Sequence, residues 1–171
     1  MYRDAGAPIE NGISWRQPTP NMKILLATIS PRRTSANSPA TTLLESYMER
    51  SSRYSPTTHR VFMNEATLLS SVEDTASRTR PILLLTDSRG KQLSSGELAA
   101  EVGRLRDTGA QTLILAVGPA DGWSAAALKR ADLTLAFGRI TLPHELAAVV
   151  AAEQIYRALT ILAGHPYHCG H

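Results

Sequence analysis

The chain has 171 residues, of which 43% are hydrophobic and 5% aromatic, and it carries a formal net charge of +3 at pH 7. This length and composition predict one α/β domain whose core is built mainly from Leu, Ala, Val and Ile, and the mild charge permits RNA as a partner without demanding it. The single cysteine, Cys169, excludes an intramolecular disulfide and indicates a reducing, cytoplasmic compartment.

Residues 1–21 mix Pro, Gly, Asn and charged residues without periodicity, so they are predicted to form a disordered extension. They lack the apolar core of a secretory signal, and no later stretch has the roughly 20 consecutive apolar residues of a membrane span. The folded domain is therefore expected over 22–171, with no membrane partner. It opens with the apolar segment KILLATI at 23–29, which predicts the first strand.

The spacing of apolar residues then predicts a helix over 41–54, after a polar loop. A short strand is expected over 60–63, and a short helix near 68–76. The continuous apolar run PILLL at 81–85 is typical of a strand that is buried on both faces. The residues TDSRGK at 86–91 are predicted to form a turn after it.

In the second half of the chain, Ser94 and Glu97 have the spacing of a capping box, which begins a helix that Gly109 ends. The remaining elements are expected to be a strand over 112–117, a short helix from Ser124 to Arg130, a strand over 133–137 and a last helix from Pro143 to about Leu162. This alternation predicts a parallel sheet of about five strands with helices on both faces.

Three loops follow strands at the edge of the sheet where open α/β folds bind ligands, namely 86–91, 118–122 and 138–142. Each holds Gly or small polar residues, so together they could line a pocket for a small polar cofactor. Taken alone, the sequence GPADG at 118–122 is more often an ordinary loop between a strand and a helix. The chain has no Walker A sequence, no GxGxxG after a strand and no GxSxG elbow, which argues against P-loop, ordinary dinucleotide-binding and hydrolase folds.

The last predicted helix is almost wholly apolar, yet it carries a few ionisable side chains. An unpaired buried charge costs roughly several kcal/mol, so these groups indicate an interface, a site, or both. Glu153 and Arg157 are four residues apart and can pair, as a plain salt bridge, an interface contact or the anchor of a site. His144, near the start of the helix, is alternatively a structural cap or core histidine.

The segment His165–His171 is the part of the chain that is densest in reactive side chains. Its three imidazoles and one thiol are zinc-ligand types. They are crowded into seven residues with no second Cys/His pair elsewhere, so no metal is expected. The alternative is a catalytic or RNA-contacting tail, in which Tyr167 stacks on a base and His168 exchanges a proton.

Several sequence blocks occur together at specific spacing: MKI at 22–24, LLTDSRGKQLSSGELA at 84–99, VGPADG at 117–122, TLPHEL at 141–146, AAEQIYRA at 151–158 and GHPYH at 164–168. In this combination they resemble the RlmH-type ribosomal RNA methyltransferases, small members of the SPOUT (α/β-knot) superfamily. The resemblance covers residues 22–168, nearly the whole predicted domain.

That resemblance implies a parallel sheet whose C-terminal segment threads a loop to form a trefoil knot, and a homodimer with the final helix at its interface. It implies S-adenosylmethionine as the cofactor and methylation of N3 of a pseudouridine in large-subunit (23S) ribosomal RNA, on the assembled ribosome. The tail of one subunit is expected to complete the site of the other.

Matched by position, the resemblance implies a cofactor-binding set of Thr86, Asp87, Gly118, Phe137, Gly138, Arg139, Ile140, Thr141 and Leu142. On the substrate side it implies catalytic residues His168, Arg157, Glu153 and Tyr167, and RNA contacts from His144, Arg157, Tyr167 and His168. His168 or Glu153 would accept the imide proton, and Arg157 would hold the anionic ring oxygen or a phosphate.

The chain departs from the family pattern at three places. Ala148 stands where the family usually has Arg, and Pro119 replaces a Gly in the middle cofactor loop and removes an N–H donor. Residues 169–171 extend the chain beyond the Tyr-His pair. Two other hypotheses therefore stay open: a diverged, non-catalytic ribosome- or rRNA-binding knot protein, and a metal-binding protein that uses the tail.

Overall fold

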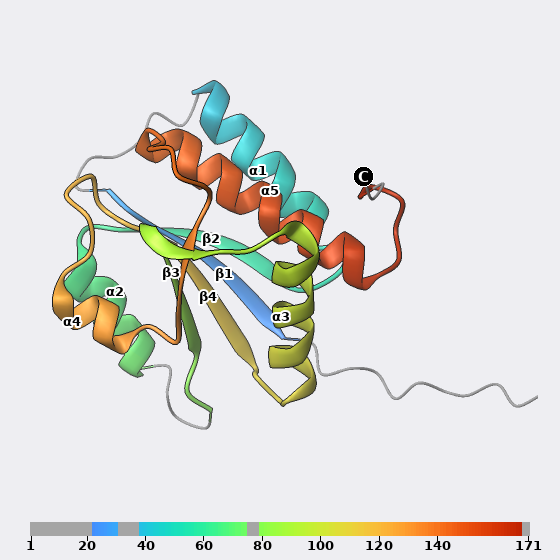
Figure 1. Ribbon diagram of the computed structural model, residues 1–171, viewed down its shortest axis with the longest axis horizontal. Helices are drawn as coiled ribbons and strands as arrows, with labels where there is room; N and C mark the ends of the chain where they lie inside the picture. Colours follow the sequence, from blue (N-terminus) through green and yellow to red (C-terminus); the bar gives the residue numbers. More distant parts are fainter. Residues whose placement is uncertain (1–21, 31–37, 75–78, 169–171) are drawn as a thin grey trace, which may run out of the picture.

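The computed structural model describes residues 22–30, 38–74 and 79–168. The predicted extension at 1–21 and residues 169–171 of the tail lie outside the described residues. Five parallel strands form one sheet, as predicted, and the structure gives their order as β2-β1-β4-β3-β5 (Figure 1). The strands are β1 (Lys23–Ile29), β2 (Thr57–Phe62), β3 (Ile82–Gln92), β4 (Thr112–Val117) and β5 (Leu133–Ala136), and the helices are α1 (Pro39–Ser51), α2 (Glu65–Asp74), α3 (Ser95–Asp107), α4 (Ala125–Arg130) and α5 (His144–Leu162).

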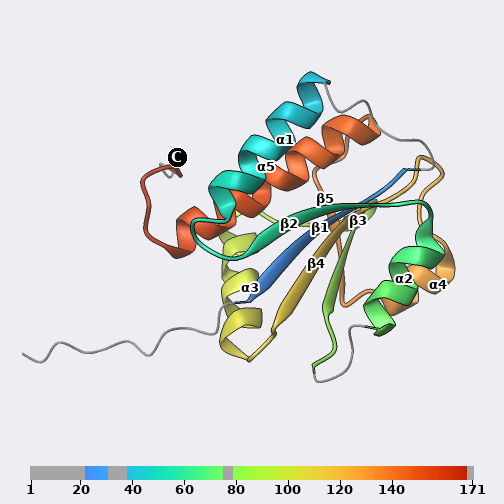
Figure 2. The same cartoon turned by 180° about the vertical axis from the view of Figure 1, so that it is seen from behind.

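Helices cover both faces of the sheet, which confirms the predicted layers. Figures 1 and 2 show α1, α3 and α5 on one face and α2 with α4 on the other. Alternation along the strands supplies two cores, because successive side chains point to opposite faces. On β1, for example, Leu26 packs on the side of α1, α3 and α5, whereas Ala27 packs on the side of α2 and α4. None of the helices in the described part of the chain is long and apolar enough to cross a membrane.

Capping groups set several helix starts. Ser94 and Glu97 form the predicted capping box at the start of α3, and the Ser124 hydroxyl accepts a hydrogen bond from the Ala127 amide at the start of α4. The helix predicted over 41–54 begins earlier, at Pro39, because Ser38 caps it. Pro143 is the N-cap of α5 rather than its first helical residue.

The predicted turn at 86–91 is wrong. β3 continues to Gln92, and it pairs with β5 on both sides of an irregularity: Leu135 is the partner of Thr86 and also of Lys91. The apolar pattern predicts that this strand ends at Leu85, but in the structure it continues through the polar residues that follow. Pairing with a strand about fifty residues later in the chain supplies hydrogen bonds that no local pattern reveals.

The second half of β3 crosses closely over β5 (Figure 1). A Cβ atom built on Gly90 would lie 2.6 Å from the backbone carbon of Leu135 and 2.8 Å from that of Thr134. Since these neighbours are backbone atoms, they cannot move aside as a flexible side chain does. Gly90 is therefore required by the approach of the two chain segments rather than by a turn.

We predict that Gly90→Ala lowers the free energy of unfolding by about 2 kcal/mol or more, since overpacking against backbone forces the two segments apart. The matched control is Gly96→Ala in the first turn of α3, where an added Cβ meets nothing within 4 Å. The control is expected to be neutral or slightly stabilising. Urea unfolding of both variants checks this, and equal stabilities would contradict the close crossing.

Candidate functional site

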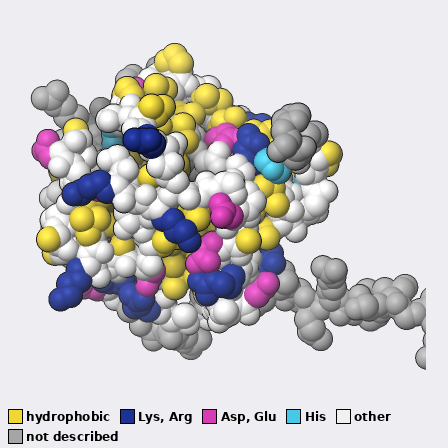
Figure 3. Space-filling model, in the orientation of Figure 1, with side chains coloured by type: hydrophobic (Ala, Val, Ile, Leu, Met, Phe, Trp, Pro, Cys, Tyr) yellow, Lys and Arg dark blue, Asp and Glu magenta, His cyan; other side chains and the backbone are white. Residues whose placement is uncertain are grey.

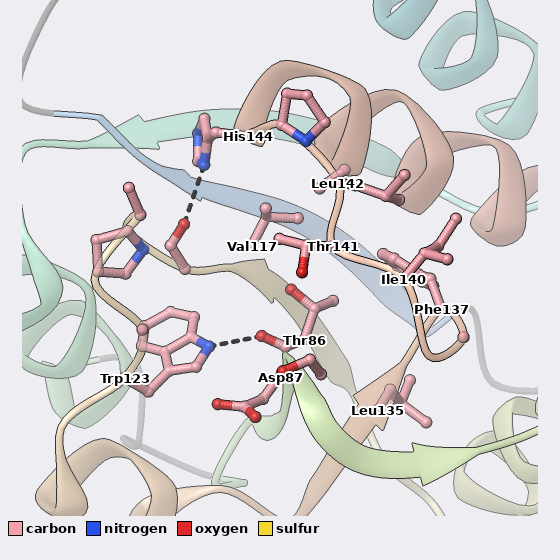
Figure 4. Close-up of a pocket in the computed structure, with 18 residues that line it drawn as sticks. Thr86, Asp87, Val117, Trp123, Leu135, Phe137, Ile140, Thr141, Leu142 and His144 are labelled. Atoms are coloured by element: carbon pink, nitrogen blue, oxygen red, sulfur yellow. Dashed lines mark hydrogen bonds between the residues drawn. The ribbon is translucent and has the colours of Figure 1, made fainter.

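A cavity of about 340 Å³ opens at the carboxyl ends of β4 and β5, beside the irregularity in the middle of β3 (Figure 4). Its walls are residues 86–88 in the middle of β3, residues 117–123 at and after the end of β4, and the segment from Phe137 into the first turn of α5. Phe137, Leu142 and Ala147 contribute apolar surface, and Thr86, Asp87 and Thr141 contribute polar groups. A concave site of this mixed lining is suited to a small organic ligand.

Trp123 holds two of these walls together. Its indole Nε1 donates a hydrogen bond to the Thr86 carbonyl oxygen at 2.9 Å, and the ring is only 7% exposed. A Cβ on Gly118 would lie 2.7 Å from Trp123 Cε2, so the backbone can pass here only as glycine. The sequence-based prediction included Gly118 but missed Trp123. The feature that could have indicated Trp123 is its position directly after the predicted loop GPADG at 118–122.

His144 ties the start of α5 to the same cavity. Its Nδ1 lies 3.0 Å from the Gly118 carbonyl oxygen (Figure 4). Because a carbonyl only accepts, Nδ1 carries the hydrogen in this contact. A neutral His144 then has its lone pair on Nε2, and no hydrogen bond to the Nε2 atom is present among the described residues.

Asp87 places a fixed negative charge in the cavity wall. Its Oδ1 accepts from the Arg89 amide at 2.8 Å and from Arg89 Nε at 3.0 Å, and its Oδ2 accepts from Arg89 Nη2 at 3.1 Å. These hydrogen bonds from Arg89 hold the pKa of Asp87 below its usual value, despite the opposing effect of burial. The carboxylate is therefore ionised throughout the neutral range.

The structure brings the predicted cofactor set together. Every member lines this cavity except Arg139, whose side chain is exposed on the loop beside it. The residues that the sequence-based set omitted are Ser88, Val117, Pro119, Ala120, Gly122, Trp123, Leu135, Pro143, His144 and Ala147.

The predicted catalytic residues form a separate cluster at the far half of α5. Glu153 Oε1 accepts from Arg157 Nε at 2.9 Å, from Arg157 Nη2 at 2.5 Å and from the Tyr167 hydroxyl at 3.1 Å. Its Oε2 accepts from Gln154 Nε2 at 2.6 Å. The Glu153 carboxylate is thus occupied by donors on both oxygens, which suits a residue that positions its neighbours.

His168 joins the cluster through Arg157. Arg157 Nη1 lies 3.3 Å from His168 Nδ1, and the guanidinium can only donate. His168 therefore accepts at Nδ1, and its neutral ring presents Nε2–H as a donor. This is the opposite tautomer from that of His144.

Aromatic residues of α1 and α5 support the tail, and sequence reasoning missed most of them. The Tyr156 and Tyr167 ring centroids are 4.7 Å apart, and Arg50 lies over the rings of Tyr47 and Tyr156 at 4.3 and 4.8 Å. Burial is the largest cause of a raised pKa at Tyr167. Its phenol is therefore protonated at neutral pH and can donate to Glu153.

The two groups of residues lie apart within one chain. At a rise of about 1.5 Å per residue, Arg157 is roughly 20 Å along α5 from His144. Neither Glu153, Arg157, Tyr167 nor His168 lines the cavity. Within the described ranges, no cluster of three or more His, Cys, Asp or Glu side chains could hold a metal ion; Cys169 and His171 fall outside those ranges.

A family model described as "Predicted SPOUT methyltransferase" matches residues 22–168. The chain is 52% identical over 130 residues to "Ribosomal RNA large subunit methyltransferase H" of Koribacter versatilis, which covers 76% of this chain and 88% of that protein. It is 57% identical over 86 residues to the protein of the same name from Brucella ovis, covering 50% of this chain and 51% of that protein.

Among solved structures, the chain is similar to the SpoU methyltransferase AviRb from Streptomyces viridochromogenes in complex with the cofactor AdoMet. The TM-score is 0.48 at 16% identity, and the match covers 86% of this chain and 60% of that one.

We predict that Arg89→Gln raises the pKa of Asp87 toward the usual value of about 4, because the charged donor is lost. The pKa of Asp87 is lowered in the folded wild type, so its contribution to stability is present above the unfolded pKa and is lost as pH falls through the folded pKa. Carboxyl ¹³C NMR titration measures this shift. Arg104→Gln, which removes the partner of Glu101 instead, is the control and should leave Asp87 unchanged.

Proposed function

The chain belongs to the predicted SPOUT methyltransferase family, and on that premise we propose that it methylates large-subunit ribosomal RNA with S-adenosylmethionine as methyl donor. The finer proposal is that the acceptor is N3 of a pseudouridine in 23S rRNA on the assembled ribosome. The single observation that carries the proposal is the cavity that three separate chain segments, 86–88, 117–123 and 137–144, line together.

The lining of this cavity fits the cofactor. Its volume of about 340 Å³ lies in the range of pockets that bind small molecules and cofactors. The backbone at Gly118 lies against the Trp123 ring, where a side chain would not fit, so this part of the cavity wall is formed by backbone atoms. The ionised Asp87 carboxylate suits a ligand that carries positive charge. Trp123, Thr86 and the segment 137–142 would hold the bound molecule.

The bound cofactor supplies an activated methyl group on a sulfonium, so the protein's task is alignment and control of charge. The acceptor imide must lose a proton, and its negative charge then spreads onto the ring oxygens. Arg157 and the Nε2–H of His168 are two donors suited to stabilising those oxygens. Glu153 and Tyr167 hold Arg157 in place, since their own polar atoms are engaged with it or with each other.

This assignment requires a second copy of the chain, because the Arg157 cluster lies too far from the cavity of its own chain. In a homodimer with α5 at the interface, each tail could reach the partner's cavity. A partly exposed stripe on α5 supports this: Leu146 is 51% exposed, and Val150 and Ile161 follow on the same side. Hydrophobic side chains also gather at the end of the molecule where α1 and α5 begin (Figure 3).

The proposal includes a trefoil knot. Two observations support it: Leu135 pairs with β3 on both sides of its irregularity, and Gly90 passes within van der Waals contact of the β5 backbone. Such an arrangement is expected when β5 passes under the loop formed by residues 87–90. Because knotted chains are rare among proteins, sequence patterns alone would not suggest a knot, and the proposal depends on this close crossing.

The surface charge supports a structured substrate rather than naked RNA. On the face shown in Figure 3, Lys and Arg side chains are interspersed with Asp and Glu and form no continuous basic patch. On this face phosphate contacts therefore supply limited affinity, and shape matching to a large particle would supply the rest.

A non-catalytic ribosome-binding protein is the second candidate. It is favoured by Pro119, which lines the cavity and offers no N–H donor. Calorimetry separates the two, because only the enzyme needs to bind S-adenosylmethionine. Intact association with ribosomes without any cofactor binding would favour the second candidate.

The proposed activity predicts one methyl group on a pseudouridine of large-subunit rRNA that disappears in cells lacking the protein, as measured by mass spectrometry of rRNA fragments. Arg157→Ala should lower turnover on ribosomes by roughly 100-fold or more, since it removes a charged donor to the developing anion. Arg53→Ala is the matched control, because Arg53 is exposed outside the cluster. Equal rRNA masses with and without the protein would sink the proposal.

The two-copy site predicts complementation between inactive variants. Gly118→Leu blocks the cavity and Arg157→Ala disables the tail, so each variant alone should be inactive. After both are unfolded and refolded together, a mixed dimer pairs the intact cavity of one chain with the intact tail of the other. Methyl transfer should therefore reappear in the mixture, and a mixture as inactive as its components would place both parts in one chain.

A further inference from the structure

A groove of about 220 Å³ lies beside the cofactor cavity and is not used by the function proposed above. It runs between the ends of β1 and β2 and the first turns of α1 and α5. His144 lines both the groove and the cavity, so the two adjoin at this side chain. Leu44, Val61 and Ala148 supply apolar surface, and Thr28, Glu45, His59 and Glu145 supply polar groups.

Two acidic side chains line the groove. Glu45 and Glu145 face it from α1 and α5, and among the described residues no Lys or Arg side chain lines it. His59 Nε2 lies 3.0 Å from Thr28 Oγ1, and burial lowers the pKa of His59 despite the opposing charge of Glu45. The His59 ring is therefore uncharged at neutral pH. The Glu45 and Glu145 carboxylates disfavour a phosphate there, and the uncharged His59 ring suits a flat, uncharged base with hydrogen-bonding edges.

The hydrogen bonds of the two histidines assign them opposite roles. His168 accepts from Arg157 at Nδ1 and is left with a donor at Nε2. His144 donates from Nδ1 to the Gly118 carbonyl oxygen and is left with an acceptor at Nε2. A residue that takes a proton from the substrate needs a free acceptor atom within reach of the reacting edge. His144 has one, and it lies where groove and cavity meet.

We propose that this groove binds the target pyrimidine base and that His144 accepts the imide proton during methyl transfer. The inference rests on the proposed function and adds the base-binding subsite and the proton acceptor. The N3–H proton moves to His144 Nε2, and the N3 lone pair forms a bond to the methyl carbon. The carbon–sulfur bond of the donor breaks, and its electron pair stays on sulfur, which leaves a neutral thioether and protonated His144.

His144→Asn is the first test, because the asparagine amide can still donate to the Gly118 carbonyl while the Nε2 acceptor is lost. At saturating cofactor, kcat should fall roughly 100-fold or more. The loss should shrink as pH rises, since the imide ionises by itself in alkaline solution. Cofactor affinity, followed by Trp123 fluorescence in a Trp15→Phe background, should stay close to that of the wild type.

Glu45→Leu tests the groove itself, with Glu49→Leu on the same exposed side of α1 as the matched control. Neither change touches the cavity or the core. Glu45→Leu should raise KM for the ribosomal substrate roughly tenfold, because a charged hydrogen-bond partner is lost. Glu49→Leu should leave KM unchanged, and cofactor affinity should be unchanged in both variants.

An active wild type whose His144→Asn variant keeps wild-type kcat, or loses it equally at every pH, would overturn the proton-acceptor assignment. Equal KM values for the two glutamate variants would overturn the proposal that the groove binds the target base. A wild type that neither binds S-adenosylmethionine nor methylates ribosomes would instead refute the proposed function. The two failures are therefore distinguishable.

Discussion

The close crossing of β3 over β5 is the constraint on which the rest of the structure depends. Leu135 pairs with β3 on both sides of its irregularity, and Gly90 leaves room for the β5 backbone to pass. This crossing directs the chain after β5 back toward the carboxyl ends of β3 and β4. The segment 137–142 consequently closes the cavity that residues 86–88 and 117–123 begin. Without the crossing, the three loops would line an open sheet edge.

α5 distributes the chemistry that follows from this arrangement. Its first turn is held to the cavity by His144, and its second half carries the Glu153–Arg157 pair that fixes Tyr167 and His168. The helix is long enough to keep these two ends apart, so one chain presents the cavity at one end and a set of hydrogen-bond donors at the other. Two copies packed through this helix could place each set against the other's cavity. The ion pair is thus more than a plain intrahelical salt bridge, because the tail is built on it.

The structure brings the residues of the two predicted sites together to different extents, for identifiable reasons. The residues predicted to bind the cofactor came together because the segments that follow the apolar parts of parallel strands lie at one edge of the sheet. Trp123 was missed because its role depends on a hydrogen bond to Thr86, which lies 37 residues away in the chain. The proton-accepting role expected of His168 or Glu153 remains a prediction that their hydrogen bonds disfavour. A histidine tautomer is set by its partners, and the amino-acid type alone leaves it open.

Hydrophobic patterning and caps in the sequence alone determined the alternation of strands and helices, the two-sided layers and the starts of α3 and α4. These features follow from local periodicity and from side chains that bond to their own backbone. Only the tertiary structure decided that β3 runs through polar residues to Gln92, that Gly90 serves a backbone crossing, and that the two ends of α5 lie apart. Each of these depends on contacts between segments distant in the chain, whose hydrogen bonds and close approaches leave no local signature.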